Sequence, residues 1–366
     1  MRRALLVLVS VGLVVGSTSG CAPPKLTPVV VASGLDHPWD IGFLPDGTML
    51  VTERPGRLSR VTDQGVVTVA APQDVVAVGE AGMMGLAVDP FFAQNRFVFV
   101  CMSSRASVVR DVRIVRFQLT ADGSRVLGRS DIVTGIPLHP EGMHAGCRPR
   151  FGPDNQLWIG TGDAATGTNP QDVTSLGGKV LRVTRTDQPA PGNPFGRLWF
   201  TRGHRNVQGL AFRPTDGVGF SIEHGTDRDD EINSPQFGGN YGWDPTPGYD
   251  QTRPMTDLER HPDAILPAWS SGDHTIAPSG ATFLTGERWG TWDGALAVAT
   301  LKGRHLHVFA VDGHGSVGTE YHALKDAFGR LRSAVQGPDG NLYLSTDNGD
   351  NSDVVVRITP SVVSSS

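Results

Sequence analysis

The sequence predicts an all-β protein, a six-bladed β-propeller. One phrase recurs along the chain: a turn rich in Pro, Asp and Gly, then a short strand that alternates polar and apolar residues, then a polar exit. The 366 residues include 46 Gly and 26 Pro, and no long amphipathic helical pattern stands out, which suits a turn-rich β fold. A β-sandwich would not repeat one phrase in this way, whereas blades of four strands with uneven loops would.

The phrase occurs six times. Its copies lie at Leu44–Thr52, Val88–Met102, Gly152–Ile159, Arg213–Phe220, Trp292–Val298 and Gly337–Ser345. Two further strand patterns, Pro28–Ala32 and Val354–Thr359, lie outside the copies, and we expect them to share one blade and close the ring. Because a propeller places one loop of each blade around a central channel, we expect active groups at scattered positions on equivalent loops.

The first residues have the features of an export signal. A basic start is followed by an apolar run over residues 4–15, which is too short to span a bilayer, and by small residues before Cys21. This start resembles a bacterial lipoprotein signal in which Cys21 is lipidated; cleavage of an ordinary secretory signal is the alternative. We therefore expect a signal peptide over 1–20, a tether over 21–28 and the propeller over 29–360, anchored by lipid to the outer face of the cytoplasmic membrane.

Two cysteines remain after Cys21, namely Cys101 and Cys147. An exported chain meets an oxidising compartment, so we expect a disulfide between them. Two buried free thiols are the alternative.

The stretch Glu141–Asp163 carries a histidine and an aspartate that one sheet rim can bring together. His144 lies in a Gly-bearing turn, and Asp163 follows the strand pattern Gln156–Gly160. A general base needs such a pair, because the histidine takes a proton while the carboxylate orients it. A loop histidine and an unrelated turn aspartate are the alternative.

The chain is acidic overall, with a formal net charge of -5 and no basic run, which argues against a nucleic-acid partner. Although the chain is acidic, four basic residues lie in loops that occupy equivalent positions beside successive copies of the repeat. They are Arg205, Lys302, Arg330 and Arg332. Arg330 and Arg332 are two residues apart, so on a strand they can point the same way. Such a cluster at one mouth of the ring favours a small ligand with several negative charges.

The acidic stretch Glu223–Asn233 combines carboxylates with Gly carbonyls. Oxygen ligands of this kind suit a hard cation, Ca²⁺ rather than Mg²⁺, although a hydrated acidic turn is an equal alternative. His305 and His307 alternate on a strand pattern and lack a third ligand, so we interpret them as structural.

Several of these segments resemble the glucose/sorbosone dehydrogenase family, which includes soluble sugar dehydrogenases that depend on pyrroloquinoline quinone (PQQ). The resemblance covers about His37 to Thr359 and is strongest in three segments, Gly203–Gly209, Glu223–Glu231 and Asn240–Trp243. Gly178–Arg182, Ala277–Gly280 and the pair Arg330 and Arg332 also match. The lipoprotein start resembles that of actinobacterial members. The resemblance implies a six-bladed propeller that oxidises an aldose sugar at its anomeric carbon to the lactone.

The resemblance also implies roles for individual residues. His144 matches the catalytic base, Asp163 the carboxylate that orients it, and Arg205 a residue that stabilises negative charge on the quinone. The residues that match the PQQ site are Glu80, Arg205, Asn206, Lys302, Arg330 and Arg332. The implied Ca²⁺ loop contains Gly225, Thr226, Asp230 and Glu231, of which the first two offer carbonyls.

Three features depart from the family pattern, and two other functions stay open. The segment Met143–Pro149 keeps the histidine but inserts a Cys and a Pro beside it. Glu80 stands where the family usually has Gln, and Thr226 where it usually has Pro. One alternative is a non-catalytic propeller that binds a sugar or an envelope partner and has lost PQQ. The other is a Ca²⁺-dependent hydrolase of the lactonase type. The sequence names neither the sugar nor the electron acceptor.

Overall fold

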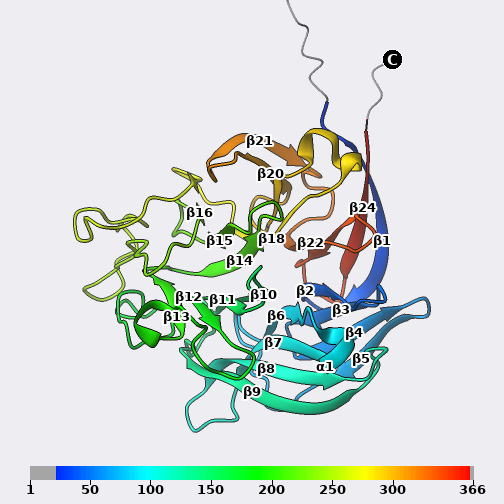
Figure 1. Ribbon diagram of the computed structural model, residues 1–366, viewed down its shortest axis with the longest axis horizontal. Helices are drawn as coiled ribbons and strands as arrows, with labels where there is room; N and C mark the ends of the chain where they lie inside the picture. Colours follow the sequence, from blue (N-terminus) through cyan, green and yellow to red (C-terminus); the bar gives the residue numbers. More distant parts are fainter. Residues whose placement is uncertain (1–21, 363–366) are drawn as a thin grey trace, which may run out of the picture.

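A computed structural model describes residues 22–362 and places them in six four-stranded antiparallel sheets around a common centre (Figure 1). The predicted six-bladed propeller is confirmed. In chain order the strands and short helices of this described part are β1 (Lys25–Leu35), β2 (Pro38–Phe43), β3 (Met49–Glu53), β4 (Arg57–Thr62), β5 (Gly65–Ala70), β6 (Met83–Val88), α1 (Phe92–Asn95), β7 (Phe97–Ser104), β8 (Asp111–Leu119), β9 (Val126–Ile136), β10 (Gly146–Phe151), β11 (Leu157–Thr161), β12 (Lys179–Val183), η1 (Pro194–Gly196), β13 (Trp199–Arg202), β14 (Val207–Phe212), β15 (Gly219–Glu223), β16 (Glu231–Asn233), β17 (Trp269–Ser270), β18 (Pro278–Phe283), η2 (Glu287–Trp292), β19 (Leu296–Thr300), β20 (Leu306–Val311), β21 (Val317–Ala323), β22 (Leu331–Gln336), β23 (Leu342–Thr346) and β24 (Asp353–Ser361).

Each copy of the repeated phrase forms the turn between the first two strands of a blade. The turns join β2 to β3, β6 to β7, β10 to β11, β14 to β15, β18 to β19 and β22 to β23. In five of them an Asp side chain accepts a hydrogen bond from the backbone N–H two residues later: Asp46, Asp89, Asp154, Asp216 and Asp339. This local bond makes the turn, which is why Asp recurs in the phrase.

The ring closes as expected, because β1 and β24 pair in one blade with β23 and β22. In Figure 1 the blue strand β1 runs beside the dark red β24. The pairing extends from Lys25↔Ser361 to Leu35↔Asp353. Residues 25–28, predicted as part of the tether, therefore belong to the propeller, since β24 satisfies the backbone hydrogen bonds of this segment.

The predicted signal peptide and Cys21 lie outside the described residues. Within residues 22–362, no helix has the length and apolar character needed to cross a membrane.

The hydrophobic core of residues 22–362 is divided into six clusters, one at each interface between neighbouring blades. In the interface between the β6–β9 and β10–β13 blades, for example, Phe99 packs with Leu181 and Trp199. The innermost strands β2, β6, β10, β14, β18 and β22 contact one another around the ring, and β22 contacts β2. The blades therefore depend on their neighbours for burial.

The axis of the ring holds a buried ion pair instead of apolar side chains. The guanidinium Nη1 of Arg148 on β10 lies 2.6 Å from Oδ1 of Asp40 on β2, and both side chains are fully buried. The guanidinium also lies 4.0 Å from the centre of the Trp39 ring. Burial alone would raise the pKa of Asp40, but Arg148 and Arg150 hold it well below its usual value, so the carboxylate stays charged.

The predicted disulfide between Cys101 and Cys147 is present. It joins β7 to β10 in the next blade, with the two Cα atoms 6.1 Å apart, and both side chains are buried. Cys147 follows the turn of His144 by three residues, so the bridge fastens the base of that turn to the neighbouring blade.

Replacing both cysteines with alanine should lower the free energy of unfolding by about 2–4 kcal/mol, because the bridge restricts the unfolded chain over a sequence separation of 46 residues. Denaturant unfolding of oxidised wild type, reduced wild type and the double variant measures the effect. Equal stability of all three, or two free thiols in peptide maps of exported protein, would contradict this expectation.

Candidate active site

The antiparallel first hairpin of each blade sets the geometry of the rim. The start of an innermost strand lies beside the end of the second strand, as in the pairing Gly146↔Thr161 between β10 and β11. Residues that precede an innermost strand therefore meet residues that follow a second strand. His144 occupies the first kind of position, and Asp163 and Asp347 occupy the second.

His144 and Asp163 form the predicted contact. Nδ1 of His144 lies 2.8 Å from Oδ1 of Asp163. The aspartate is completely buried, while 11% of the histidine side chain is exposed. A charged carboxylate can only accept, so Nδ1 carries the proton and donates, and Nε2 keeps its lone pair. This is the tautomer that a general base needs.

Two aromatic side chains that sequence reasoning did not assign to the base hold the Asp163 carboxylate. Nε1 of Trp243 donates to Oδ2 at 2.8 Å, and the hydroxyl of Tyr249 donates to the same oxygen at 2.6 Å. Burial, followed by the negative charge of Asp163, raises the pKa of Tyr249, so its hydroxyl remains a donor. The orientation of His144 therefore depends on an irregular segment far from it in sequence.

Arg205 and Asn206 precede β14 and lie directly against the His144 turn. The backbone N–H of Asp163 donates to the Arg205 carbonyl at 2.8 Å, and the N–H of Gly146 donates to Oδ1 of Asn206 at 3.0 Å. Nδ2 of Asn206 donates to Oε2 of Glu80 at 3.1 Å. The structure thus brings together residues from three of the predicted loops.

Arg332 joins this group through a buried hydrogen-bond chain. Its Nη1 donates to Oε1 of Gln208 at 3.1 Å, and Nε2 of Gln208 donates to Oδ1 of Asn206 at 3.3 Å. Nε of Arg332 donates to Oδ2 of Asp347 at 3.0 Å. Arg332 is thereby fixed in one position beneath the rim.

The carboxylate of Asp347, which the sequence analysis did not single out, has several cationic neighbours. Nη1 of Arg54 lies 3.9 Å from it, and Nε of the exposed Arg330 donates to the Asp347 carbonyl at 3.1 Å. Burial alone would raise the pKa of Asp347, but Arg332 and Arg54 hold it below its usual value. Two guanidinium groups thus share one negative charge and a third lies on the backbone carbonyl of the same residue, so these groups keep a positive excess.

His224 lies between these cations. Burial, followed by the charges on Arg332 and Arg205, lowers the pKa of its imidazole to about 3, so the ring is neutral. Its Nε2 and the Nε of Arg205 are buried and have no hydrogen-bond partner among the described residues. Polar atoms buried without partners are costly, which points to a ligand that would satisfy them.

The remaining predicted residues lie further from this group or have other partners. Lys302 is exposed in the loop after β19. The buried Asp230 accepts hydrogen bonds from the backbone N–H groups of Gly225, Ile276 and Ala277. Its role in the structure is to shape the loop around residues 225 and 226.

The side chain of Glu231 accepts hydrogen bonds from neighbouring residues. Nδ2 of Asn233 donates both to Oε2 of Glu231 at 3.1 Å and to Oε1 of Glu223 at 2.8 Å. Burial, followed by the charge on Glu223, raises the pKa of Glu231 well above its usual value. Of the predicted metal loop, this leaves the carbonyls of Gly225 and Thr226 as the simplest oxygen donors.

A pocket of about 390 Å³ opens beside the same loop. It is lined by Thr226, Asp227, Arg228, Gln251 and Thr252. Gln251 connects it to the site, because Nη2 of Arg205 donates to Oε1 of Gln251 at 3.2 Å.

Known proteins resemble this chain over nearly its whole length. A putative glucose dehydrogenase of Thermus thermophilus is 36% identical, with a TM-score of 0.80, over 91% of this chain and all of the other. The PQQ-bound aldose sugar dehydrogenase of Streptomyces coelicolor is 31% identical, with a TM-score of 0.76, over 92% of this chain and all of the other. The aldose sugar dehydrogenase YliI of Escherichia coli is 30% identical over 93% of this chain and 94% of its own.

The family model described as glucose / sorbosone dehydrogenase matches residues 35–356, which span all six blades. The suspected resemblance is confirmed, and the chain belongs to the glucose/sorbosone dehydrogenase family.

Proposed function

We propose that the protein is a PQQ-dependent dehydrogenase that oxidises an aldose sugar at its anomeric carbon to the lactone. The observation that carries the proposal is the His144–Asp163 hydrogen bond at the edge of a cationic cluster. The names of the relatives support it, since they include sugar dehydrogenases and a PQQ-bound form.

The residues present fit a cofactor with several carboxylates. Arg54 and Arg332 share the carboxylate of Asp347, while Arg330 donates to the backbone carbonyl of the same residue, so the three guanidinium groups retain positive charge for a further anion. Arg205 Nε and His224 Nε2 are buried without partners in the described part of the chain, beside the same cations. We assign Lys302, Arg330 and Arg332 to the carboxylates, and Arg205 and Asn206 to the quinone oxygens.

The chain itself supplies the proton transfer. Nε2 of His144 accepts the proton of the anomeric hydroxyl, and Asp163 stabilises the imidazolium that forms. Bound PQQ supplies the ortho-quinone that takes up hydride from the same carbon. Loss of one proton and one hydride converts the C–OH of the sugar ring into the C=O of a lactone. The guanidinium of Arg205 stabilises the negative charge that develops nearby.

Calcium is part of the proposal through the loop at residues 225 and 226. The carbonyls of Gly225 and Thr226 would hold Ca²⁺ beside the cofactor. Asp230 supports this loop from within, because its carboxylate accepts the N–H of Gly225 at 2.9 Å. Glu231 is the first residue of β16 and directly follows Asp230 in the chain.

Replacing His144 with alanine should lower turnover by about two to four orders of magnitude, the usual contribution of a positioned base. PQQ affinity should change little, because other residues hold the carboxylates. Asp163→Asn should also lower turnover, since the histidine would lose its charged partner. Dye-linked aldose oxidation measures turnover, and absorbance titration measures PQQ binding.

His139→Ala is a matched control, because His139 lies in the same connection and its ring accepts a hydrogen bond from the N–H of Glu141 within its own turn. Unchanged turnover in His144→Ala would contradict the role of this residue as the base.

Glu80→Gln should raise PQQ affinity about tenfold, equivalent to ~1.4 kcal/mol, because it removes a negative charge near an anionic ligand. The new amide keeps an oxygen for Nδ2 of Asn206, so the local hydrogen bond survives.

Lys302→Ala should lower PQQ affinity, because it removes a positive charge that we assign to the carboxylates of the cofactor. Lys325→Ala, which changes an exposed loop residue, should leave PQQ affinity unchanged. If neither wild type nor Glu80→Gln binds PQQ in the presence of Ca²⁺, the dehydrogenase proposal fails and a binding propeller remains.

We also propose that lipid on Cys21 anchors the protein to the outer face of the cytoplasmic membrane. The lipoprotein-like start of the sequence supports this, and multiple acyl chains on one cysteine hold a protein firmly. Cys21→Ala should move the protein from the membrane fraction to the soluble fraction, as measured by immunoblotting. Equal membrane retention of the variant, or a soluble wild type, would contradict lipid anchoring.

A further inference from the structure

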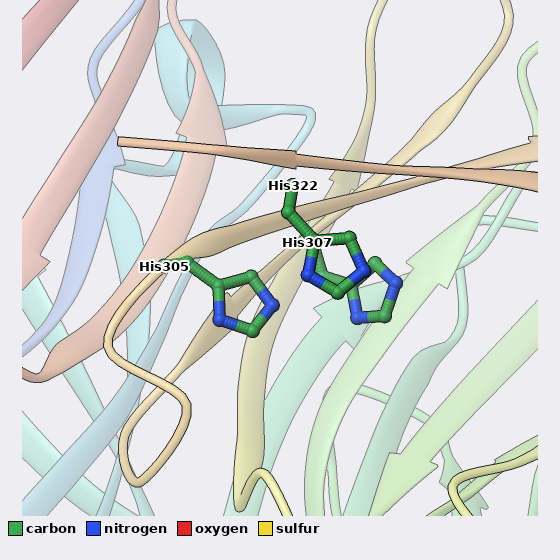
Figure 2. Close-up of side chains that lie close together, drawn as sticks. All are labelled: His305, His307 and His322. Atoms are coloured by element: carbon green, nitrogen blue, oxygen red, sulfur yellow. The ribbon is translucent and has the colours of Figure 1, made fainter. Parts of the chain in front are cut away.

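Three histidines gather on the β20–β21 hairpin, away from the residues that surround His144. His305 immediately precedes β20, His307 lies on β20, and His322 lies directly opposite His307 on β21. One ring nitrogen from each lies within 4.8 Å of the others (Figure 2). The sequence analysis interpreted His305 and His307 as structural because no third ligand was evident. In the structure, the register of the β20–β21 hairpin places His322 opposite His307, and His322 can be that third ligand.

Hydrogen bonds fix the protons on the two buried rings. Nδ1 of His305 lies 2.8 Å from the Gly303 carbonyl, and Nε2 of His307 lies 2.8 Å from Oε2 of Glu320. A carbonyl and a carboxylate accept, so each of these nitrogens carries the proton and donates. The lone pairs are therefore left on Nε2 of His305 and Nδ1 of His307.

These two lone-pair nitrogens are buried and have no hydrogen-bond partner among residues 22–362. Only 5% of His305 and 2% of His307 is exposed. With its other nitrogen protonated and donating, each ring offers its remaining lone pair to a metal. Buried polar atoms without partners are costly, and a metal ion that accepts both lone pairs would satisfy them.

The surroundings of His307 match those of a metal-bound histidine. Such a ring usually donates its second N–H to a carboxylate, which fixes its orientation. Here Glu320 plays that part, and its other oxygen accepts the Nε1–H of Trp269 at 2.8 Å. The Trp269 ring also packs edge-on against His307, with centroids 5.6 Å apart.

We propose that His305, His307 and His322 bind a divalent transition-metal ion such as Zn²⁺ or Cu²⁺. Imidazole is a preferred ligand of these ions, and three histidines leave one position for water. Ligand nitrogens of a tetrahedral Zn²⁺ site lie about 3.4 Å apart, so the rings must draw together from the present arrangement. His322 is exposed and stacks on His305 with ring centroids 4.6 Å apart, so its side chain has room to turn toward the ion.

The site is separate from the proposed PQQ site. β20 and β21 are the third and fourth strands of their blade, counted from the innermost strand β18. The ion would join the two outer strands of this blade and stabilise the β20–β21 hairpin. Its binding can therefore be measured on protein that contains neither PQQ nor Ca²⁺.

Isothermal titration with Zn²⁺ tests the proposal on chelator-treated full-length protein that carries no histidine tag. We expect one ion per wild-type chain and a higher Tm in its presence. His322→Gln should weaken binding by about 100-fold or more and abolish the Tm increase, and Glu320→Gln should weaken binding by about 10- to 100-fold. Because His322 is exposed, its replacement should leave the Tm of the metal-free protein unchanged.

His314→Gln is the matched control, since His314 is an exposed histidine in the turn of the same hairpin and is not part of the cluster. Its Zn²⁺ affinity should equal that of wild type. No Zn²⁺ binding by wild type, equal binding by wild type and His322→Gln, or loss of binding in His314→Gln would each overturn the proposal. Visible absorption of the Co²⁺-loaded protein should show tetrahedral nitrogen coordination in wild type and in His314→Gln, but not in His322→Gln.

Discussion

The ion pair between Asp40 and Arg148 is the interaction on which the ring depends. Asp40 also accepts hydrogen bonds from the N–H of Leu86 and the hydroxyl of Ser333, while Arg148 donates to the carbonyl of Gln208 and to Ser279. These partners lie on β6, β22, β14 and β18, so together with β2 and β10 the pair contacts the innermost strand of every blade. A buried charge without its partner is strongly destabilising, which makes the pair a condition for assembling the centre.

The same centre supports the rim. Gln208 accepts from Arg332 and donates to Asn206, and the carbonyl of the same glutamine binds Arg148. Residues assigned to cofactor binding are thus held by the groups that hold the blades together. Such shared bonds keep the rim residues in fixed positions before a ligand arrives, which lowers the entropy lost on binding.

The fold was predictable because five of the six blades repeat one local interaction, the hydrogen bond of the aspartate in the first turn. The His144–Asp163 contact follows from the antiparallel hairpin. Trp243 and Tyr249 were not predictable as partners of Asp163, because they lie in residues 241–268, where turns and irregular backbone carry no periodic pattern.

The sequence analysis did not find the His305–His307–His322 cluster for another reason. A register shift between Phe309 and Val311 alters which residues of β20 and β21 face each other, and it leaves no mark in the sequence.

The pairing of β1 with β24 also determines when the fold can be completed. These strands are the first and the last of the described chain, so the blade that contains both forms only after nearly all other residues are available. Contacts between residues so distant in sequence form slowly, because the intervening loop must be closed first. While the chain folds, the earlier blades would therefore keep one apolar interface open until β24 pairs with β1. In that interval the unfinished ring offers an exposed edge on which other chains can aggregate.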